Sequence, residues 1–304
     1  AHDAVVGLTR TIEFVSLVRE AGLAESWCQT FITPDNALAE RLATDRRVAF
    51  LSFIGSARVG WHLHSKLAPG TRSALEHGGV APAIVDRSAN LDALIEPMVK
   101  GGYYHAGQVC VSTQRIYVHS TLMSAFLDRF VTRVRALRVG DPLLPETEVG
   151  PLITAREADR VESWVTEAAT AGAKVLAGGK RVSATIIEPT VLLEPAPDAR
   201  VSREEVFGPV TCVYSFDQID DAIDRANSLP VAFQASVFAN DIGVALYAAD
   251  RLDASAVMIN DHTAFRTDWM PFAGRRESGY GVGGIPFSMR EMTQEKMRVF
   301  RYPA

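Results

Sequence analysis

The chain has 304 residues, 47% hydrophobic and 22% charged, which is typical of a globular protein with room for two domains. Its formal net charge of −5 gives no electrostatic reason to expect nucleic acid or an anionic membrane as a partner, so a small molecule is the expected ligand. There is no membrane-span run and no signal-peptide layout at the start, and the three cysteines form no CxxC pair, so we expect a reduced, cytoplasmic protein.

The first part of the chain predicts two units in which helices and strands alternate. A helix is expected over 8–21, where apolar residues recur at helical spacing: Leu8, Ile12, Val15 and Val18. A strand-like stretch follows at 27–33. The second unit consists of a capped helix, a buried strand and another helix, at 35–44, 46–55 and 56–68.

The alternation continues to the end of the chain and indicates the α/β class with a parallel sheet. Further helices are expected at about 121–137, 154–171, 217–227 and 241–250. Intervening strands are expected at 113–119, 173–178, 209–216, 235–240 and 255–260. The last stretch, 295–304, alternates in character and predicts a strand that pairs with another domain or subunit.

Three short stretches carry residues suited to chemistry. In FIGSARVG, Gly55 and Ser56 lie between a strand and a helix, where backbone N–H groups can meet a phosphate, although simple turn chemistry explains the same pair. In LEHGG, Glu76 precedes two glycines, and Cys110 follows 34 positions later in GQVC. A thiolate and a carboxylate suit covalent catalysis through a thioester. A solvated glutamate and a buried thiol are the alternative.

The histidines leave a second enzyme class open. A cysteine hydrolase needs a histidine partner for its thiol, and His77, His105 and His262 are candidates. Metal binding is not indicated, because His62 and His64 are two residues apart and lie on different faces of a helix.

Six stretches in chain order together resemble the aldehyde dehydrogenase superfamily: FIGSARVG, LEHGG, GQVC, EEVFGPV (204–210), MIN (258–260) and PFAGRRESGYG (271–281). The resemblance extends over essentially the whole chain. Within the superfamily, the sequence is most similar to the lactaldehyde and phosphonoacetaldehyde type. It implies an aldehyde-dehydrogenase-like α/β fold in three parts. These are the C-terminal part of a Rossmann-type cofactor domain (1–78), an α/β catalytic domain (79–278) and a C-terminal segment with an oligomerisation strand (279–304).

The resemblance also implies an activity and the residues that carry it. A small aldehyde would be oxidised to its carboxylic acid through a thiohemiacetal and a thioester on Cys110, with Glu76 as general base and NAD or NADP as cofactor. The presence of Glu76 favours hydrolysis over transfer of the acyl group to coenzyme A. The other implied roles are Gly55 and Ser56 at the cofactor diphosphate, Glu205 at the nicotinamide ribose, Phe207 beside the nicotinamide, and Asn260 and Phe272 as structural or channel residues. A homo-oligomer, dimer or tetramer, is expected.

Arg266, in NDHTAFRTDWMP, is the candidate specificity residue. Its guanidinium can grip a carboxylate or phosphonate on a small aldehyde, although a solvated loop arginine is equally compatible with the pattern.

The chain also departs from the family pattern. The resemblance starts after the family's N-terminal region, which holds the first strands of the cofactor fold and an asparagine that helps form the oxyanion hole. Ile54 stands where threonine is frequent, His77 where leucine is frequent, and GVGGI where an acidic residue sometimes occurs. We therefore expect a fragment or a shortened relative. The alternative function is a catalytically impaired protein that acts by binding or by joining a complete subunit.

Overall fold

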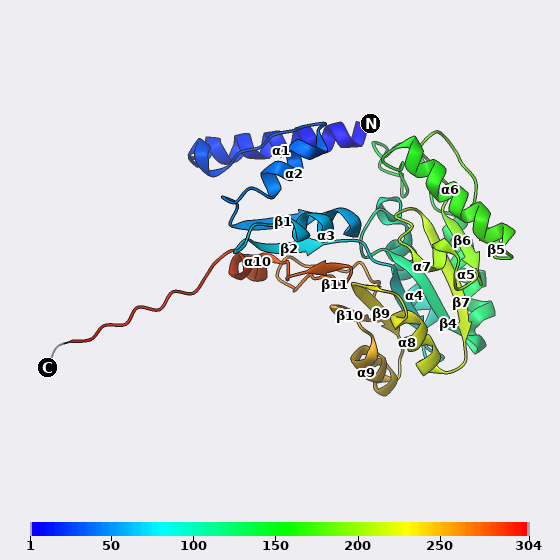
Figure 1. Ribbon diagram of the computed structural model, residues 1–304. Helices are drawn as coiled ribbons and strands as arrows, with labels where there is room; N and C mark the ends of the chain where they lie inside the picture. The colour runs from blue at the N-terminus through cyan, green and yellow to red at the C-terminus, as the bar shows by residue number, and fades with distance from the viewer. Residues whose placement is uncertain (1, 303–304) are drawn as a thin grey trace.

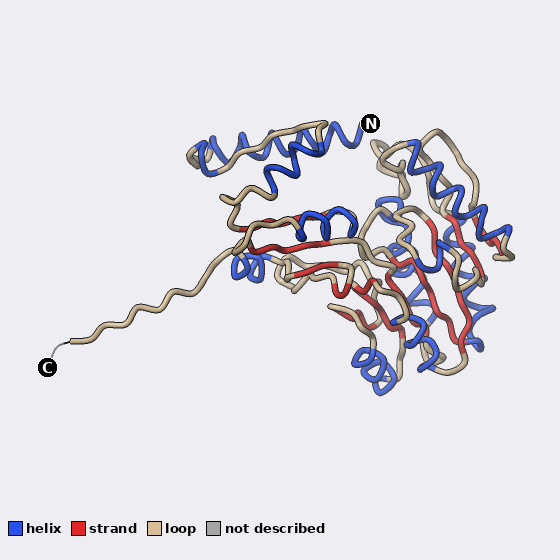
Figure 2. Tube along the Cα trace, in the orientation of Figure 1, coloured by secondary structure: helices blue, strands red, loops and turns tan. Residues whose placement is uncertain are grey.

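The computed structural model describes residues 2–302, with side chains from Arg10 onward. It is an α/β structure with two main sheets, visible in Figures 1 and 2. The larger sheet has the strand order β10-β9-β3-β4-β7-β6-β5, and its strands are β3 (Ala81–Val85), β4 (Thr113–His119), β5 (Lys174–Ala177), β6 (Thr190–Leu193), β7 (Val210–Phe216), β9 (Gln234–Phe238) and β10 (Ala256–Ile259). The smaller has the order β1-β2-β12, with β1 (Phe50–Ile54), β2 (Arg72–Glu76) and β12 (Gly279–Tyr280).

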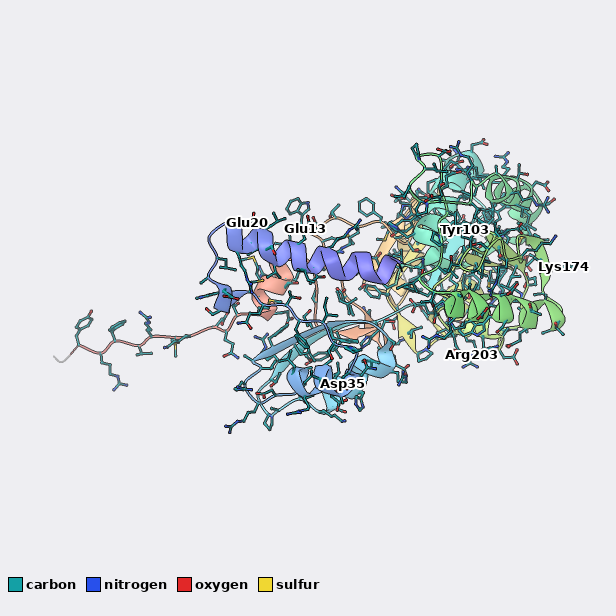
Figure 3. All side chains as sticks on the ribbon, turned by 90° about the horizontal axis from the view of Figure 1, so that it is seen from above. Glu13, Glu20, Asp35, Tyr103, Lys174 and Arg203 are labelled. Atoms are coloured by element: carbon teal, nitrogen blue, oxygen red, sulfur yellow. The ribbon has the colours of Figure 1, made fainter. Side chains whose placement is uncertain are left out.

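The larger sheet forms the main core, and all its strand pairs are parallel except β5 with β6. Its central strands are buried almost throughout, which explains their continuous apolar runs. Five helices belong to this body: α4 (Leu91–Tyr103), α5 (Met123–Arg135), α6 (Ala155–Thr170), α8 (Ile219–Asn227) and α9 (Ile242–Arg251). Figure 3 shows side chains densely packed in this body, around Tyr103. The five strands and four helices predicted from residue 113 to residue 260 are confirmed.

The smaller sheet pairs β1 with β2 in parallel and β2 with β12 in antiparallel, and α3 (Ala57–Ser65) packs on β2. The predicted strand at 46–55 forms, but the expectation that it is buried is wrong. Its side chains are half-buried or exposed, and Ile54 is 77% exposed, because β1 lies at the edge of its sheet. A small two-stranded ladder joins β8 (Val231–Ala232) to β11 (Arg275–Arg276).

The N-terminal helices α1 (His2–Glu20) and α2 (Asn36–Ala43) lie beside the smaller sheet (Figure 1). Both were predicted, and the Asp35 side chain caps α2 by accepting a hydrogen bond from the Ala37 amide. The predicted apolar stripe of α1 is partly covered: Val15 is buried, Val18 half-buried and Ile12 exposed, while the side chain of Leu8 lies outside the described residues.

Of the two strand predictions near the ends of the chain, the one at 27–33 is wrong, and the one at 295–304, which needs another domain or subunit as its neighbour, stays a prediction. Residues 27–33 form no strand, because a short 3-10 turn at Glu25–Trp27 leads into irregular chain. The short helix α7 (Arg200–Arg203) belongs to the main body, and the last described helix is α10 (Ile285–Glu291). Beyond α10, residues 293–302 extend away from the body without strand pairing (Figure 1). A strand needs a neighbour for its backbone hydrogen bonds, and no described strand lies beside either segment. Residues 303–304 lie outside the described part. Between residues 2 and 302, no helix combines the length and apolarity needed to cross a membrane.

The connection between the two sheets determines where a site can form. The chain leaves β2 at Glu76 and enters β3 at Ala81. The carboxyl ends of β1 and β2 therefore come close to the segments that precede β3, β4 and β7. The predicted chemical residues cluster at this junction.

Candidate active site

Cys110 lies in a turn between a strained 3-10 segment, Tyr104–Gly107, and the start of β4. Within that segment Gly107 has φ of +70°, and a Cβ there would lie 2.1 Å from the carbonyl oxygen of Gly208. Glycine is thus required for the close approach that joins the GQVC stretch to EEVFGPV. Behind Cys110 lies a small apolar cluster that contains Val111, Phe233 and Phe272.

The Cys110 thiol is half-buried in an acidic environment. Burial, together with the negative charges of Glu205 and Glu76, raises the pKa of the thiol to about 12, while the positive charge of Arg266 acts in the opposite direction. The resting group at neutral pH is therefore a thiol, and it must transfer its proton before it can act as a nucleophile.

Glu76 is the last residue of β2, and strand alternation directs it away from Leu75 and His77, which are buried. Burial raises the pKa of its carboxyl group, and the charge of Arg266 partly offsets that rise. A carboxylate with a raised pKa is a better proton acceptor than an ordinary surface glutamate.

Glu205 packs directly on the backbone that follows β2. Its Oε1 accepts a hydrogen bond from the Gly79 amide at 3.2 Å, and a Cβ on Gly78 would lie 1.9 Å from its carboxylate. Burial raises the pKa of Glu205 to about 7. Next to it, Phe207 adopts φ of +46°, a strained value for a side chain of this size, and remains partly exposed.

One pocket of about 480 Å³ brings most of the predicted residues together. Its lining includes six of them: Gly55, Ser56, Glu76, Cys110, Glu205 and Phe207. They lie just after β1, at the end of β2 and in the segments before β4 and β7, so four separate parts of the chain meet in one cavity.

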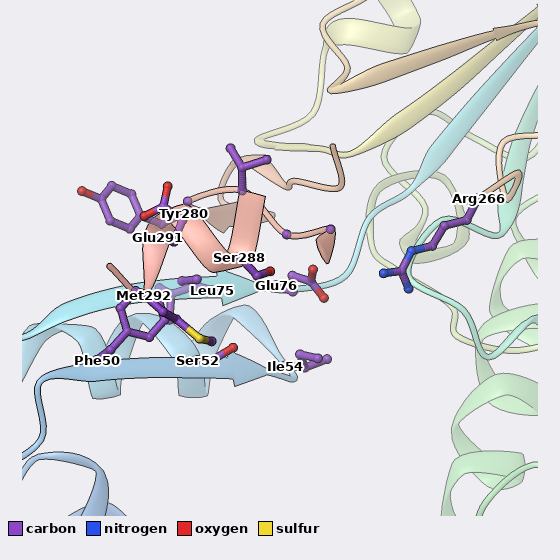
Figure 4. Close-up of a pocket in the computed structure, with 15 residues that line it drawn as sticks. Phe50, Ser52, Ile54, Leu75, Glu76, Arg266, Tyr280, Ser288, Glu291 and Met292 are labelled. Carbon is purple, nitrogen blue, oxygen red and sulfur yellow. The ribbon is translucent and has the colours of Figure 1, made fainter. Parts of the chain in front are cut away.

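Arg266 and Phe272 have different positions. Arg266 lines a neighbouring cavity of about 220 Å³ that shares Glu76 with the first, and its guanidinium is directed toward Glu76 (Figure 4). The guanidinium carbon lies 4.5 Å from the ring centroid of Phe272, which is buried. Phe272 thus makes a cation–π contact with the Arg266 guanidinium and lines neither cavity.

The three candidate histidine partners make contacts with other groups, and His77 also lines the pocket of Cys110. His77 is 2% exposed and its Nδ1 lies 3.1 Å from the Gly55 carbonyl oxygen, so its ring packs under α3. The ring of His105 packs on Tyr104, and His262 packs against Gly101. The charges that shift the pKa of Cys110 come from Glu205, Glu76 and Arg266, with no histidine of residues 2–302 among them, which argues against a cysteine–histidine dyad.

Replacing Glu205 by glutamine is expected to stabilise the protein at high pH. The folded-state pKa of about 7 lies above the ordinary value of 4.5, so the stabilisation from protonated Glu205 is complete below pH 4.5 and is lost as pH rises through 7. Glu205→Gln cannot ionise, so it should gain about 2 kcal/mol over the parent protein at pH 8 and almost nothing at pH 4.5. Thermal unfolding of both proteins at the two pH values measures this. An equal difference at both would contradict the ionisation of Glu205 as the cause.

Two residues near the pocket were not predicted from the sequence. Gln114 is buried in β4, and Arg160 of α6 donates a hydrogen bond to the Val206 carbonyl at 2.6 Å. The only sequence signal for Gln114 is a polar residue in an apolar strand, and Arg160 lies in an ordinary polar helix pattern.

Comparisons with known proteins show which proteins this chain is similar to. The aldehyde dehydrogenase family model matches residues 5–298. A relative from Priestia megaterium, named 3-sulfolactaldehyde dehydrogenase, is 36% identical over 288 residues, which cover 95% of this chain and 60% of the relative. The chain thus spans little more than half the length of the curated relatives it matches.

Two solved structures are also similar. An NAD-dependent aldehyde dehydrogenase from Sinorhizobium meliloti has a TM-score of 0.90 at 33% identity, over 94% of this chain and 57% of that one. A glyceraldehyde-3-phosphate dehydrogenase from Methanocaldococcus jannaschii, solved with NADP, has a TM-score of 0.81 at 37% identity, over 84% and 55%.

Proposed function

Because this chain belongs to the aldehyde dehydrogenase family, we propose that it oxidises a small aldehyde to the carboxylic acid with NAD or NADP. The observation that carries the proposal is the single pocket in which Cys110 lies with Glu76 and Glu205. Aldehyde-dependent reduction of NAD and NADP by the full-length protein tests it. If neither cofactor is reduced with any of a panel of small aldehydes, the proposal is wrong.

We propose that Cys110 is the nucleophile. Its proton moves to a carboxylate, for which Glu76 is the candidate, and Sγ attacks the aldehyde carbon. Glu76 returns this proton to the carbonyl oxygen, which gives a thiohemiacetal and leaves Glu76 ionised. Loss of a hydride to the nicotinamide and of the hydroxyl proton to solvent would leave the acyl group on Sγ as a thioester. Glu76 then accepts a proton from water as the water attacks the acyl carbon, which releases the acid and restores the thiol.

The residues around the pocket fit a nicotinamide dinucleotide. Gly55 and Ser56 are exposed at the amino end of α3, where backbone N–H groups can bind a diphosphate. The missing side chain at Gly78 allows the Glu205 carboxylate to reach the pocket, where it can accept hydrogen bonds from ribose hydroxyls. The exposed ring of Phe207 is suited to contact the nicotinamide. When bound, the cofactor supplies the hydride acceptor.

We further propose that the preferred aldehyde carries an anionic group, which Arg266 recognises. The position of Arg266 beside Glu76 supports this, and the similar proteins include one named for a sulfonated and one for a phosphorylated aldehyde. The hydroxy aldehydes of the lactaldehyde type are the other candidates.

Replacing Arg266 by alanine is expected to raise KM for anionic aldehydes about tenfold or more, because a charge-assisted contact to the substrate is lost. The KM for neutral aldehydes of similar size should change less than about twofold. Steady-state kinetics with matched substrates measures the difference. Arg156→Ala, which removes an exposed arginine on α6, is the control. Equal effects of Arg266→Ala on neutral and anionic substrates would rule out the recognition role.

We also propose a role for each of three parts of the chain. Residues 1–78 would contribute to cofactor binding, 79–278 would form the catalytic domain and 279–304 would mediate homo-oligomerisation. The exposed apolar side chains of Met297, Phe300 and Tyr302 support the last role. The three cysteines are free, which supports a cytoplasmic location.

A second candidate function, binding to a complete subunit, is favoured by the uncovered surface of the N-terminal region. Several large apolar side chains are exposed there: Ile12, Phe14, Leu17, Trp27, Phe31 and Leu42. Exposed apolar patches of this kind mark interaction surfaces. Full activity of the purified protein without a partner would favour the first function over this one.

A further inference from the structure

The segment that carries Glu205 and Phe207 is held by one buried side chain of the neighbouring strand. Gln114 is the second residue of β4, four positions after Cys110, and is 5% exposed. Its amide nitrogen donates to the carbonyl oxygens of Val201 and Glu204, each at 2.8 Å. Its amide oxygen accepts from the Val206 amide at 2.9 Å.

These three hydrogen bonds enclose Glu205. The bonds to Glu204 and Val206 involve the residues on either side of it, and both N–H donors of the Gln114 amide are used. Arg160 holds the next peptide unit by donating a hydrogen bond to the Val206 carbonyl oxygen. A fully satisfied polar contact in a buried strand specifies one backbone conformation, because each unmade bond would leave a buried polar group without a partner.

The neighbouring backbone shows why such support is needed. Phe207 has a positive φ, a conformation that costs free energy and persists only where its surroundings enforce it. Among the described residues, Gly79 alone donates a hydrogen bond to the side chain of Glu205, so the position of this side chain depends mainly on where its backbone is held.

We propose that Gln114 is a positioning residue that holds residues 204–207 in the conformation that binds the nicotinamide cofactor. The inference rests on the proposed dehydrogenase function. Since the bonds act on the segment with Glu205 and Phe207, Gln114 determines affinity for the cofactor and has little influence on the aldehyde.

Another buried glutamine provides a matched control. Gln234 of β9 lies in the same sheet and is 0% exposed, and neither of its amide atoms has a hydrogen-bond partner among the described residues. Replacing either glutamine by methionine preserves the approximate size, but only Gln114→Met removes bonds to the segment 204–207.

The experiment compares Gln114→Met and Gln234→Met in the full-length protein. For Gln114→Met we expect about a tenfold rise in KM for NAD or NADP, and about tenfold faster hydrogen exchange in a peptide that covers 204–208. The KM for the aldehyde should stay within about twofold, and Gln234→Met should leave all three unchanged. Gln114→Asn keeps the amide with a shorter reach and should give the same pattern at about threefold. This variant decides the question if Gln114→Met does not fold.

Unchanged exchange in the Gln114 variant would overturn the proposal, as would equal rises in KM for cofactor and aldehyde. Direct titration of the parent protein with NADH distinguishes failure of the proposed dehydrogenase function from failure of the proposed positioning role of Gln114. If the parent neither binds the cofactor nor oxidises aldehydes, the proposed function fails, and the exchange rate of 204–208 alone decides whether Gln114 holds the segment.

Discussion

Replacing Cys110 by serine is expected to lower kcat/KM for aldehyde oxidation at least a thousandfold, with little change in the thermal unfolding temperature. Oxygen replaces sulfur at nearly constant volume in a half-buried position, so the pocket should retain its shape. A serine hydroxyl in the same acidic surroundings would hold its proton more strongly than the thiol, whose pKa is already raised to about 12. The measurement is aldehyde-dependent reduction of NAD or NADP.

Cys28→Ser is the matched control for this variant, because Cys28 is also a free, half-buried cysteine and lies outside the pocket. It should retain full activity. If Cys110→Ser keeps more than about a tenth of the parent activity, Cys110 is not the nucleophile.

Replacing Glu76 by glutamine is expected to reduce steady-state turnover by about a hundredfold to ten-thousandfold, since an amide cannot accept the proton of the hydrolytic water. If Glu76 acts mainly in this last step, rapid mixing should reveal a burst of about one reduced cofactor per site followed by slow release of acid. The raised pKa of Glu76 further predicts that parent turnover rises with pH as this carboxyl group ionises. This pH dependence should disappear in Glu76→Gln.

The control for Glu76 is Glu204→Gln, which neutralises an exposed carboxylate adjacent to Glu205. It should leave turnover within about twofold of the parent. Unchanged steady-state turnover in Glu76→Gln would contradict a general-base role. Loss of the burst would instead show that Glu76 is also needed before the thioester forms.

Much of the secondary structure of the main body could be predicted because its strands are mostly apolar and its helices have one apolar face. The stretch at 113–119 was predicted as a strand and forms β4, where a continuous apolar run matches a strand covered on both faces. Helix α6 begins at a threonine cap and has a clear apolar face. Two elements with an internal proline were not predicted: strand β3, which contains Pro82, and helix α4, which contains Pro97.

The wrong strand prediction at 27–33 and the untested one at 295–304 depend on the same condition. Both stretches have residues that favour strands, but a strand is completed only by hydrogen bonds to a neighbour that is distant in sequence. No local pattern states whether that neighbour is present. The same limit applies to β1, whose apolar residues suggested burial although it forms an edge.

Residue patterns were enough to predict the α/β class, most elements of the main body and, through resemblance, the family and the candidates Cys110, Glu76 and Glu205. These predictions depend on which residue types occur at short spacing, and such local patterns can be read directly from the sequence. Three features became visible only in the tertiary structure. Four distant segments meet in one pocket, Phe272 makes a cation–π contact with Arg266, and Gln114 is hydrogen-bonded to the segment that contains Glu205. The tertiary structure also decided that burial, together with two carboxylates, raises the pKa of the Cys110 thiol. Burial and charge proximity depend on contacts between residues far apart in the chain, and these exist only once the sheets have packed.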